Sequence, residues 1–290
     1  MGFCHSMFCA VLLMPVLQMR DSPQATREPW GRIRLLEEKG TAHGNPELLN
    51  YLKSLTAEEM LTAARQASRE AEAHAGPYSD TPRIAAANLA VSLCLQYYTD
   101  KWEHPADGVR RVLKVLNDAD ESPLLRHAIL ELMSCSPFNP FVEELRAYAS
   151  AHLPEVDRLL SSIVKNKRED PGLRDAAMFA LGAILEDKVR LACLSDANVR
   201  AESKRTGKVV RVGELVRSGE LSLAETTWKA LKPIEERILA NAKLLSAIMQ
   251  DQKNEPETLR ARARVRLKAY RRLPLVQVDE IDRILQRSNE

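Results

Sequence analysis

The chain has 290 residues, of which 45% are hydrophobic and 28% are charged, and this composition excludes a low-complexity or intrinsically disordered protein. Its 42 basic and 40 acidic side chains give a formal net charge of +2, so the overall charge does not indicate a nucleic-acid-binding protein. Val, Ile and Thr do not form alternating runs between turn residues, which leaves β-strands with little support.

The N-terminal segment, residues 1–45, is predicted to be mostly irregular, with a short helix around Ile33–Lys39 as an option. Met7–Leu17 is an apolar run that is too short for a membrane span of about 20 residues. Its length suits a secretory signal peptide within residues 1–25, but no Lys or Arg precedes the run and charged residues follow where cleavage needs neutral ones. The alternatives are a disordered tail or initiation at Met19. Localisation therefore stays divided between the cytoplasm, which is slightly favoured, and export.

Residues 46–194 carry apolar side chains with the period of an α-helix. Thr56 and Glu59 have the spacing of a capping box, which predicts a helix that begins there and runs to about His74. Three further stretches have the same helical spacing of apolar residues: Val109–Leu116, Val156–Ile163 and Leu173–Leu185. Such spacing places the apolar residues on one face of each helix, where burial stabilises it.

Several of these helices are similar in sequence. Pro123–Leu130 and Pro171–Met178 have proline, leucine, arginine and alanine at matching positions, and Asp80–Ala87 fits the same frame without the arginine. The prolines of the three copies are 41 and 48 residues apart, close to the period of about 40–47 in HEAT and armadillo arrays. Asp170–Gly182 (DPGLRDAAMFALG) resembles the second-helix signature of a HEAT repeat.

The resemblance to the HEAT and armadillo superfamily covers roughly residues 50–190, and it implies an architecture but no activity. In that family, small Ala and Gly residues let paired helices approach closely, and the Asp and Arg often bond between neighbouring repeats. The expected fold is all-α. It is either a HEAT-like α-solenoid or an irregular multi-helix bundle of stacked antiparallel helix pairs.

After residue 194 the apolar pattern stops. Residues 195–220 are polar and charged, and they predict a long surface loop with a short strand as an option at Val209–Val212. Ser222 and Glu225 have the spacing of a second capping box, which predicts the start of a long helix. Residues 221–290 are thus expected to form C-terminal helices.

One of these C-terminal helices, residues 257–272, is basic and amphipathic. Four basic residues share one face and a fifth lies at its border: Arg260, Arg264, Lys268, Arg271 and Arg272. Such a face is typical of a binding site for phosphate, nucleic acid or an acidic protein. The alternative is a solvated surface at the end of the helical array, paired with nearby acids such as Glu257 and Asp279.

Residues with catalytic or metal-binding spacing are not found. The six histidines are isolated, the five cysteines lack CxxC spacing, and neither a P-loop nor GxSxG occurs. No catalytic, metal-binding or cofactor-binding residue is therefore predicted, and no small-molecule ligand is indicated. Trp102, in a polar context, is a candidate anchor for a partner. The alternative is that it packs over a turn.

These observations rank three functions. The leading prediction is a non-enzymatic protein-interaction or scaffold module, since stacked helices expose broad surfaces and another protein is then the expected partner. The second is a nucleic-acid- or phosphate-binding protein that uses the basic C-terminal helix. The third is an enzyme similar to the HEAT-like DNA glycosylases, which fold analogy alone suggests.

Overall fold

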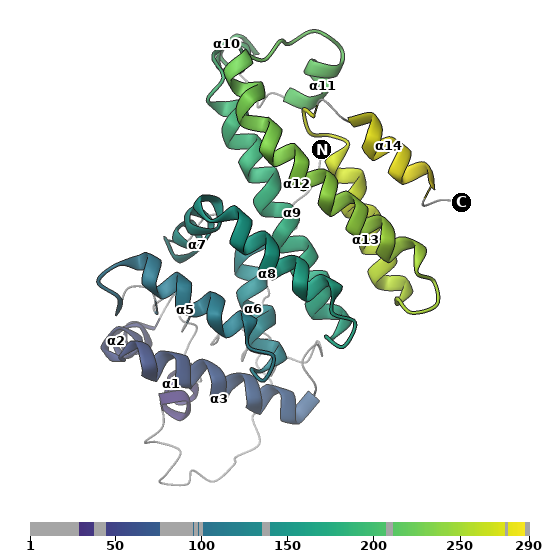
Figure 1. The fold of residues 1–290 in the computed structure, drawn as a ribbon. Helices are drawn as coiled ribbons and strands as arrows, with labels where there is room; N and C mark the ends of the chain where they lie inside the picture. The colour runs from purple at the N-terminus through teal and green to yellow at the C-terminus, as the bar shows by residue number, and fades with distance from the viewer. Residues whose placement is uncertain are drawn as a thin grey trace.

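The computed structural model describes residues 29–37, 45–75, 95, 98, 101–134, 140–206, 211–275 and 278–287. This part of the chain contains thirteen helices and no strand, as the all-α prediction requires (Figure 1). No helix in it is long and apolar enough to span a membrane. The apolar run Met7–Leu17 and the sequence copy Asp80–Ala87 lie outside the described residues.

The helices follow one another with short connections. The N-terminal ones are α1 (Pro29–Glu37), α2 (Pro46–Ser54), α3 (Ala57–Ala75), α5 (Pro105–Asn117), α6 (Pro123–Ser134), α7 (Pro140–Ala151) and α8 (Leu153–Lys165). The C-terminal ones are α9 (Pro171–Leu194), α10 (Ala197–Thr206), α11 (Val212–Arg217), α12 (Glu225–Gln250), α13 (Glu257–Tyr270) and α14 (Val278–Arg287). α1 thus lies in the segment that was predicted to be mostly irregular, and it overlaps the short helix that was an option around Ile33–Lys39.

Local sequence explains where many helices begin. Six of them have proline as their first residue (α1, α2, α5, α6, α7 and α9), a position where the missing N–H would have no helical partner anyway. The capping box before α3 is confirmed. The amide of Thr56 donates to Glu59 Oε2 at 2.8 Å, and the amide of Glu59 donates to Thr56 Oγ1 at 3.3 Å.

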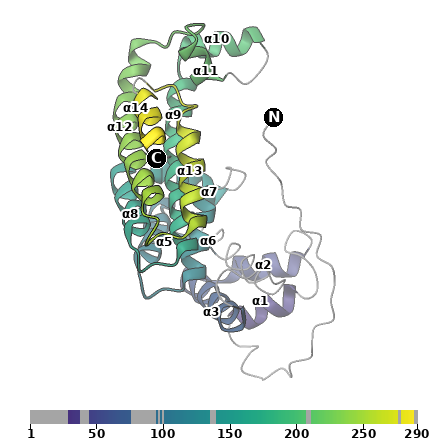
Figure 2. The same cartoon turned by 90° about the vertical axis from the view of Figure 1, so that its right-hand side faces the viewer.

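The helices pack in sequence along the molecule. α6 packs against α3 and α9, and α9 packs in turn against α13, while α5, α8 and α12 cover α6, α9 and α13 respectively. α1 to α3 lie at the bottom of Figure 1, and α10 and α11 lie at the top. Figure 2 shows α9, α12 and α13 running alongside one another. One continuous apolar core extends from Ile33 of α1 to Leu285 of α14.

The turns before α6, α9 and α13 share a pattern of hydrogen bonds. Each begins with an Asp or Asn that caps the preceding helix: Asp118, Asn166 and Asp251. Its side chain accepts a hydrogen bond from a backbone amide within the turn, at 3.0–3.1 Å. Its carbonyl accepts another from the amide of a glutamate at 3.0–3.2 Å, and these glutamates are Glu121, Glu169 and Glu255.

Each of these glutamates forms an ion pair with an arginine of an earlier helix. Arg65 of α3 pairs with Glu121 at 2.7 Å. In α6, Arg126 binds both carboxylate oxygens of Glu169, at 2.8 and 2.9 Å. In α9, Arg174 binds both oxygens of Glu255, at 2.6 and 2.7 Å, and these two side chains are only 3% and 2% exposed. We call these three contacts the Arg–Glu links.

The sequence-based prediction of a surface loop over residues 195–220 is wrong, because α10 and α11 form there. The predicted strand lies mostly outside the described residues, and Val212 begins α11. The prediction that Ser222 and Glu225 form a second capping box is also wrong, because α12 begins at Glu225 and a residue elsewhere in the chain caps it. The buried carboxylate of Asp196 accepts from the amide of Ala224 at 2.8 Å and from Thr227 Oγ1 at 2.6 Å. It also accepts from the first turn of α10.

Asp196 therefore ties α10 to α12, and we expect Asp196→Asn to lower the free energy of unfolding by about 1–3 kcal/mol at neutral pH. Burial raises the pKa of Asp196, but its four hydrogen bonds outweigh burial and the net pKa is lowered. The stabilisation is then fully present above the unfolded-state pKa of about 3.9 and is lost as pH falls through the lower folded-state pKa.

Urea unfolding of the wild type and Asp196→Asn between about pH 7 and pH 3 measures this effect. The difference in stability should shrink toward the acid end. A difference that stays constant over that range would contradict the role of the charged carboxylate.

Candidate functional site

The basic residues of α13 do not share one role. Its inner side faces α9, where Arg262 pairs with Asp175 at 3.4 Å and lies 5.5 Å from the centre of the Phe179 ring. Burial raises the pKa of Asp175, and Arg262, His127 and Arg266 lower it in part. The basic pattern of the sequence does not distinguish this inner pair, Arg262 and Arg266, from the other arginines of the helix.

Arg266 is the most enclosed cation of α13, at 8% exposure. Its guanidinium donates to Glu186 at 2.6 Å and to the carbonyl of Phe179 at 3.2 Å, and it lies over the Phe179 ring at 4.4 Å. Gly182 makes this possible, because a Cβ there would lie 2.5 Å from Arg266 Nε. A glycine in the middle of α9 thus lets α13 approach closely.

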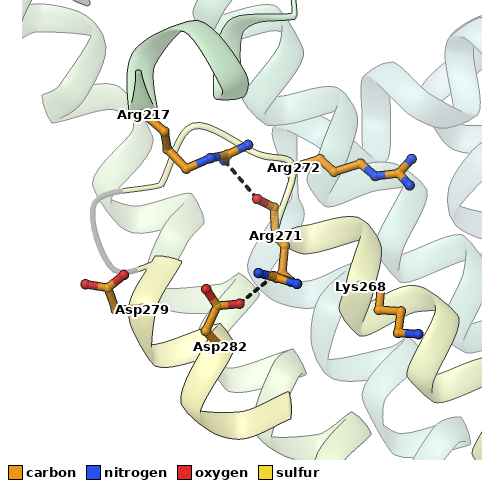
Figure 3. Close-up of a pocket in the computed structure, with 6 residues that line it drawn as sticks. All are labelled: Arg217, Lys268, Arg271, Arg272, Asp279 and Asp282. Carbon is orange, nitrogen blue, oxygen red and sulfur yellow. Dashed lines mark hydrogen bonds and ion pairs between the residues drawn. The ribbon is translucent and has the colours of Figure 1, made fainter. Parts of the chain in front are cut away.

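An open hollow lies at the C-terminal end of α13, between α11 and α14 (Figure 3). It is lined by Arg217, Lys268, Arg271, Arg272, Asp279 and Asp282. Arg271 forms an ion pair with Asp282 of α14. Arg217 donates to the carbonyl oxygen of Arg271 at 2.8 Å. The side chains of Lys268 and Arg272 extend away from the two acids in Figure 3.

Gly213 lets α11 approach the backbone of Arg272 and Leu273 closely. A Cβ at this position would lie 2.0 Å from the carbonyl oxygen of Arg272. We therefore expect Gly213→Ala to push α11 away from residues 271–273 and to lower the free energy of unfolding by about 1–3 kcal/mol. Urea unfolding, with hydrogen exchange of the amides of Arg272, Leu273 and Leu275, measures both effects. Unchanged exchange of these amides would contradict the predicted displacement.

The five predicted anion-binding residues have different surroundings in the structure. Arg271 is paired with Asp282, and Lys268 and Arg272 line the hollow. Arg264 is exposed, and Arg260 is half-buried. Among the described residues Arg260, Arg264, Lys268 and Arg272 form no ion pair. Four of the five are thus exposed, as a solvated face requires, but in the part of the chain that the structure describes only Arg271 is paired with one of the nearby acids.

Trp102 is half-buried rather than exposed. The guanidinium of Arg111 lies 4.0 Å above its ring, and Tyr98 meets it edge to face at 5.7 Å. Its ring packs against the apolar core. These contacts match the alternative in which Trp102 packs over a turn.

α13 covers one side of α9, and the corresponding side of α13 is exposed. Counted from the first residue of each helix, positions 5, 9 and 12 of α9 are Asp175, Phe179 and Gly182, which all contact α13. The same positions of α13 are Ala261, Val265 and Lys268. All three are exposed, and Val265 is 56% exposed. We call Ala261, Val265 and Lys268 the open face of α13.

The described residues contain no group of His, Cys, Asp or Glu side chains that could hold a metal ion. Cys193 is buried, and burial raises the pKa of its thiol to about 11, so it is protonated at neutral pH. Comparison with protein-family models, curated proteins and solved structures found no match for the chain.

Proposed function

We propose that this protein is a non-enzymatic protein-interaction module and that its helix pairs form a HEAT-like array. The open face of α13 is the observation that carries the proposal. It presents an apolar side chain, Val265, between Arg264 and Lys268, on the side of α13 that corresponds to the side of α9 packed against α13. A partner helix would bury that apolar surface and meet the two cations.

The Arg–Glu links support a scaffold role. Each one joins a helix to the turn before a later helix, and the link between Arg174 and Glu255 is almost fully enclosed. Buried bidentate pairs fix distance and orientation, because a shifted pair would leave charges without partners. The links would therefore hold α6, α9 and α13 in a fixed relation and present the open face on a rigid support.

The proposal is tested by retaining proteins from an extract of the source cells on the immobilised chain and then measuring the purified partner by calorimetry. Val265→Glu should weaken the affinity at least about tenfold, because it replaces the apolar side chain by a charged one in the contact. Lys243→Glu, at an exposed position of α12, is the matched control and should not change it. Equal affinity for all three proteins would contradict the proposal.

The hollow at the end of α13 supports a second candidate, a site for phosphate groups or nucleic acid. Its lining holds four basic side chains and two acidic ones, and Lys268 and Arg272 have no ion-pair partner among the described residues. Binding to a mixed DNA and RNA pool should then weaken with salt. Lys268→Glu combined with Arg272→Glu should abolish it, and salt-independent binding would contradict this candidate.

A further inference from the structure

Arg260 stands at the position that forms an Arg–Glu link in two earlier helices. Leucine and arginine are the third and fourth residues of α6, α9 and α13 alike. The three arginines are Arg126, Arg174 and Arg260. The first two bind a glutamate with both arms of the guanidinium.

The bound glutamate has a fixed place in each link. Glu169 immediately precedes Asp170, the N-terminal capping residue of α9, and Glu255 immediately precedes Pro256, which has the same place before α13. The arginine Nε donates to a carbonyl at the end of the preceding helix, at 3.0 Å for Arg126 and 2.9 Å for Arg174. An arginine in this position thus binds a glutamate that lies just before the next helix packed against its own.

Arg260 lacks both partners. The turn before α13 spans residues 251–256, one residue more than the turns before α6 and α9. Arg260 Nε is enclosed and has no hydrogen-bond partner, and the described part of the chain places no carboxylate within ion-pair distance of its guanidinium. A partly enclosed cation without a partner is unfavourable, and a carboxylate from outside would relieve it.

We infer that Arg260 recognises a glutamate that immediately precedes the N-terminal capping residue of a partner protein's helix, and that this helix lies along the open face of α13. The inference rests on the proposed protein-interaction function and specifies the partner. The partner helix would pack against α13 in the same way that α13 packs against α9.

The charges of the open face add a second requirement. In the contact between α9 and α13, position 12 is Gly182 and the tenth residue of α13, Arg266, lies against it. Position 12 of α13 is Lys268, so the tenth residue of the partner helix would lie against a lysine. The complementary partner therefore carries an acid there, where α13 itself carries an arginine.

A labelled peptide from this chain tests the inference. The probe is residues 168–188, which contain Glu169 and the α9 sequence, with Ala180→Glu to place an acid at the tenth helical position. Binding to the full chain is followed by fluorescence anisotropy. Arg260→Gln in the protein and Glu169→Gln in the peptide should each weaken binding about tenfold, and the two together should weaken it no further.

Two more variants separate the possible results. Arg260→Lys keeps the charge but cannot bind both oxygens, so it should lose most of the coupling, and circular dichroism checks that each variant folds. Binding that Val265→Glu weakens but that shows no coupling between Arg260 and Glu169 would overturn the inference and leave the proposed function standing. No binding of the probe would also overturn the inference. Dimerisation of the chain alone, abolished by Val265→Glu, would assign the face to a second copy and overturn it too.

Discussion

Replacing Glu255 by glutamine should lower the free energy of unfolding by about 3–5 kcal/mol, because it leaves the buried guanidinium of Arg174 without its counter-charge. Both side chains are almost fully enclosed, so water cannot replace the lost carboxylate oxygen. The pair also joins α9 to the turn before α13, 81 residues away in the sequence. Urea unfolding at neutral pH measures the loss as a lower midpoint.

Two comparisons test the cause of this loss. Arg174→Met combined with Glu255→Leu removes both charges and should be more stable than Glu255→Gln alone. Lys167→Met breaks the more exposed pair between Lys167 and Asp251 and should leave the midpoint nearly unchanged. A double variant less stable than the single variant would show that the buried pair itself is strongly stabilising.

Gly182→Ala should lower the free energy of unfolding in the wild type but raise it when Arg266 is replaced by alanine. In the wild type, the new methyl group would meet the Arg266 side chain at 2.5 Å, so we expect a loss of about 1–3 kcal/mol. In the Arg266→Ala background the space is free. There alanine should stabilise α9 by up to about 1 kcal/mol over glycine, since it is the better helix former.

The four proteins of this cycle are compared by urea unfolding at one pH. The two changes should be coupled by about 2 kcal/mol, since the residues are in direct contact. An equal loss from Gly182→Ala in both backgrounds would contradict the close approach of α13 to α9 at this point.

Sequence alone could predict the helices whose signals are local. Prolines mark the starts of α6 and α9, and the reciprocal bonds of Thr56 and Glu59 fix the start of α3. Helix α10 was missed because it has no apolar stripe and only Val199 of it is buried. The carboxylate of Asp196, which joins the starts of α10 and α12, stabilises this region, and a periodicity argument does not detect such a contact.

The candidate site was predicted only in outline. A basic α13 could be predicted from composition, but the division of its arginines between α9, α14 and solvent depends on which helices pack against it. Glu255 lies far from Arg174 in the sequence, so no spacing rule links them. One signal was available: aligning Leu259–Arg260 with Leu173–Arg174 gives Val265 the place of Phe179.

Site-specific photo-crosslinking inside the source cells tests most directly whether the open face of α13 binds a protein. A benzoylphenylalanine replaces Val265 in one variant and Lys243 in a control variant, both at exposed positions. We predict a discrete adduct from position 265, absent from position 243 and lost when Arg260→Gln is added. No adduct from position 265, or the same adducts from both positions, would contradict the claim.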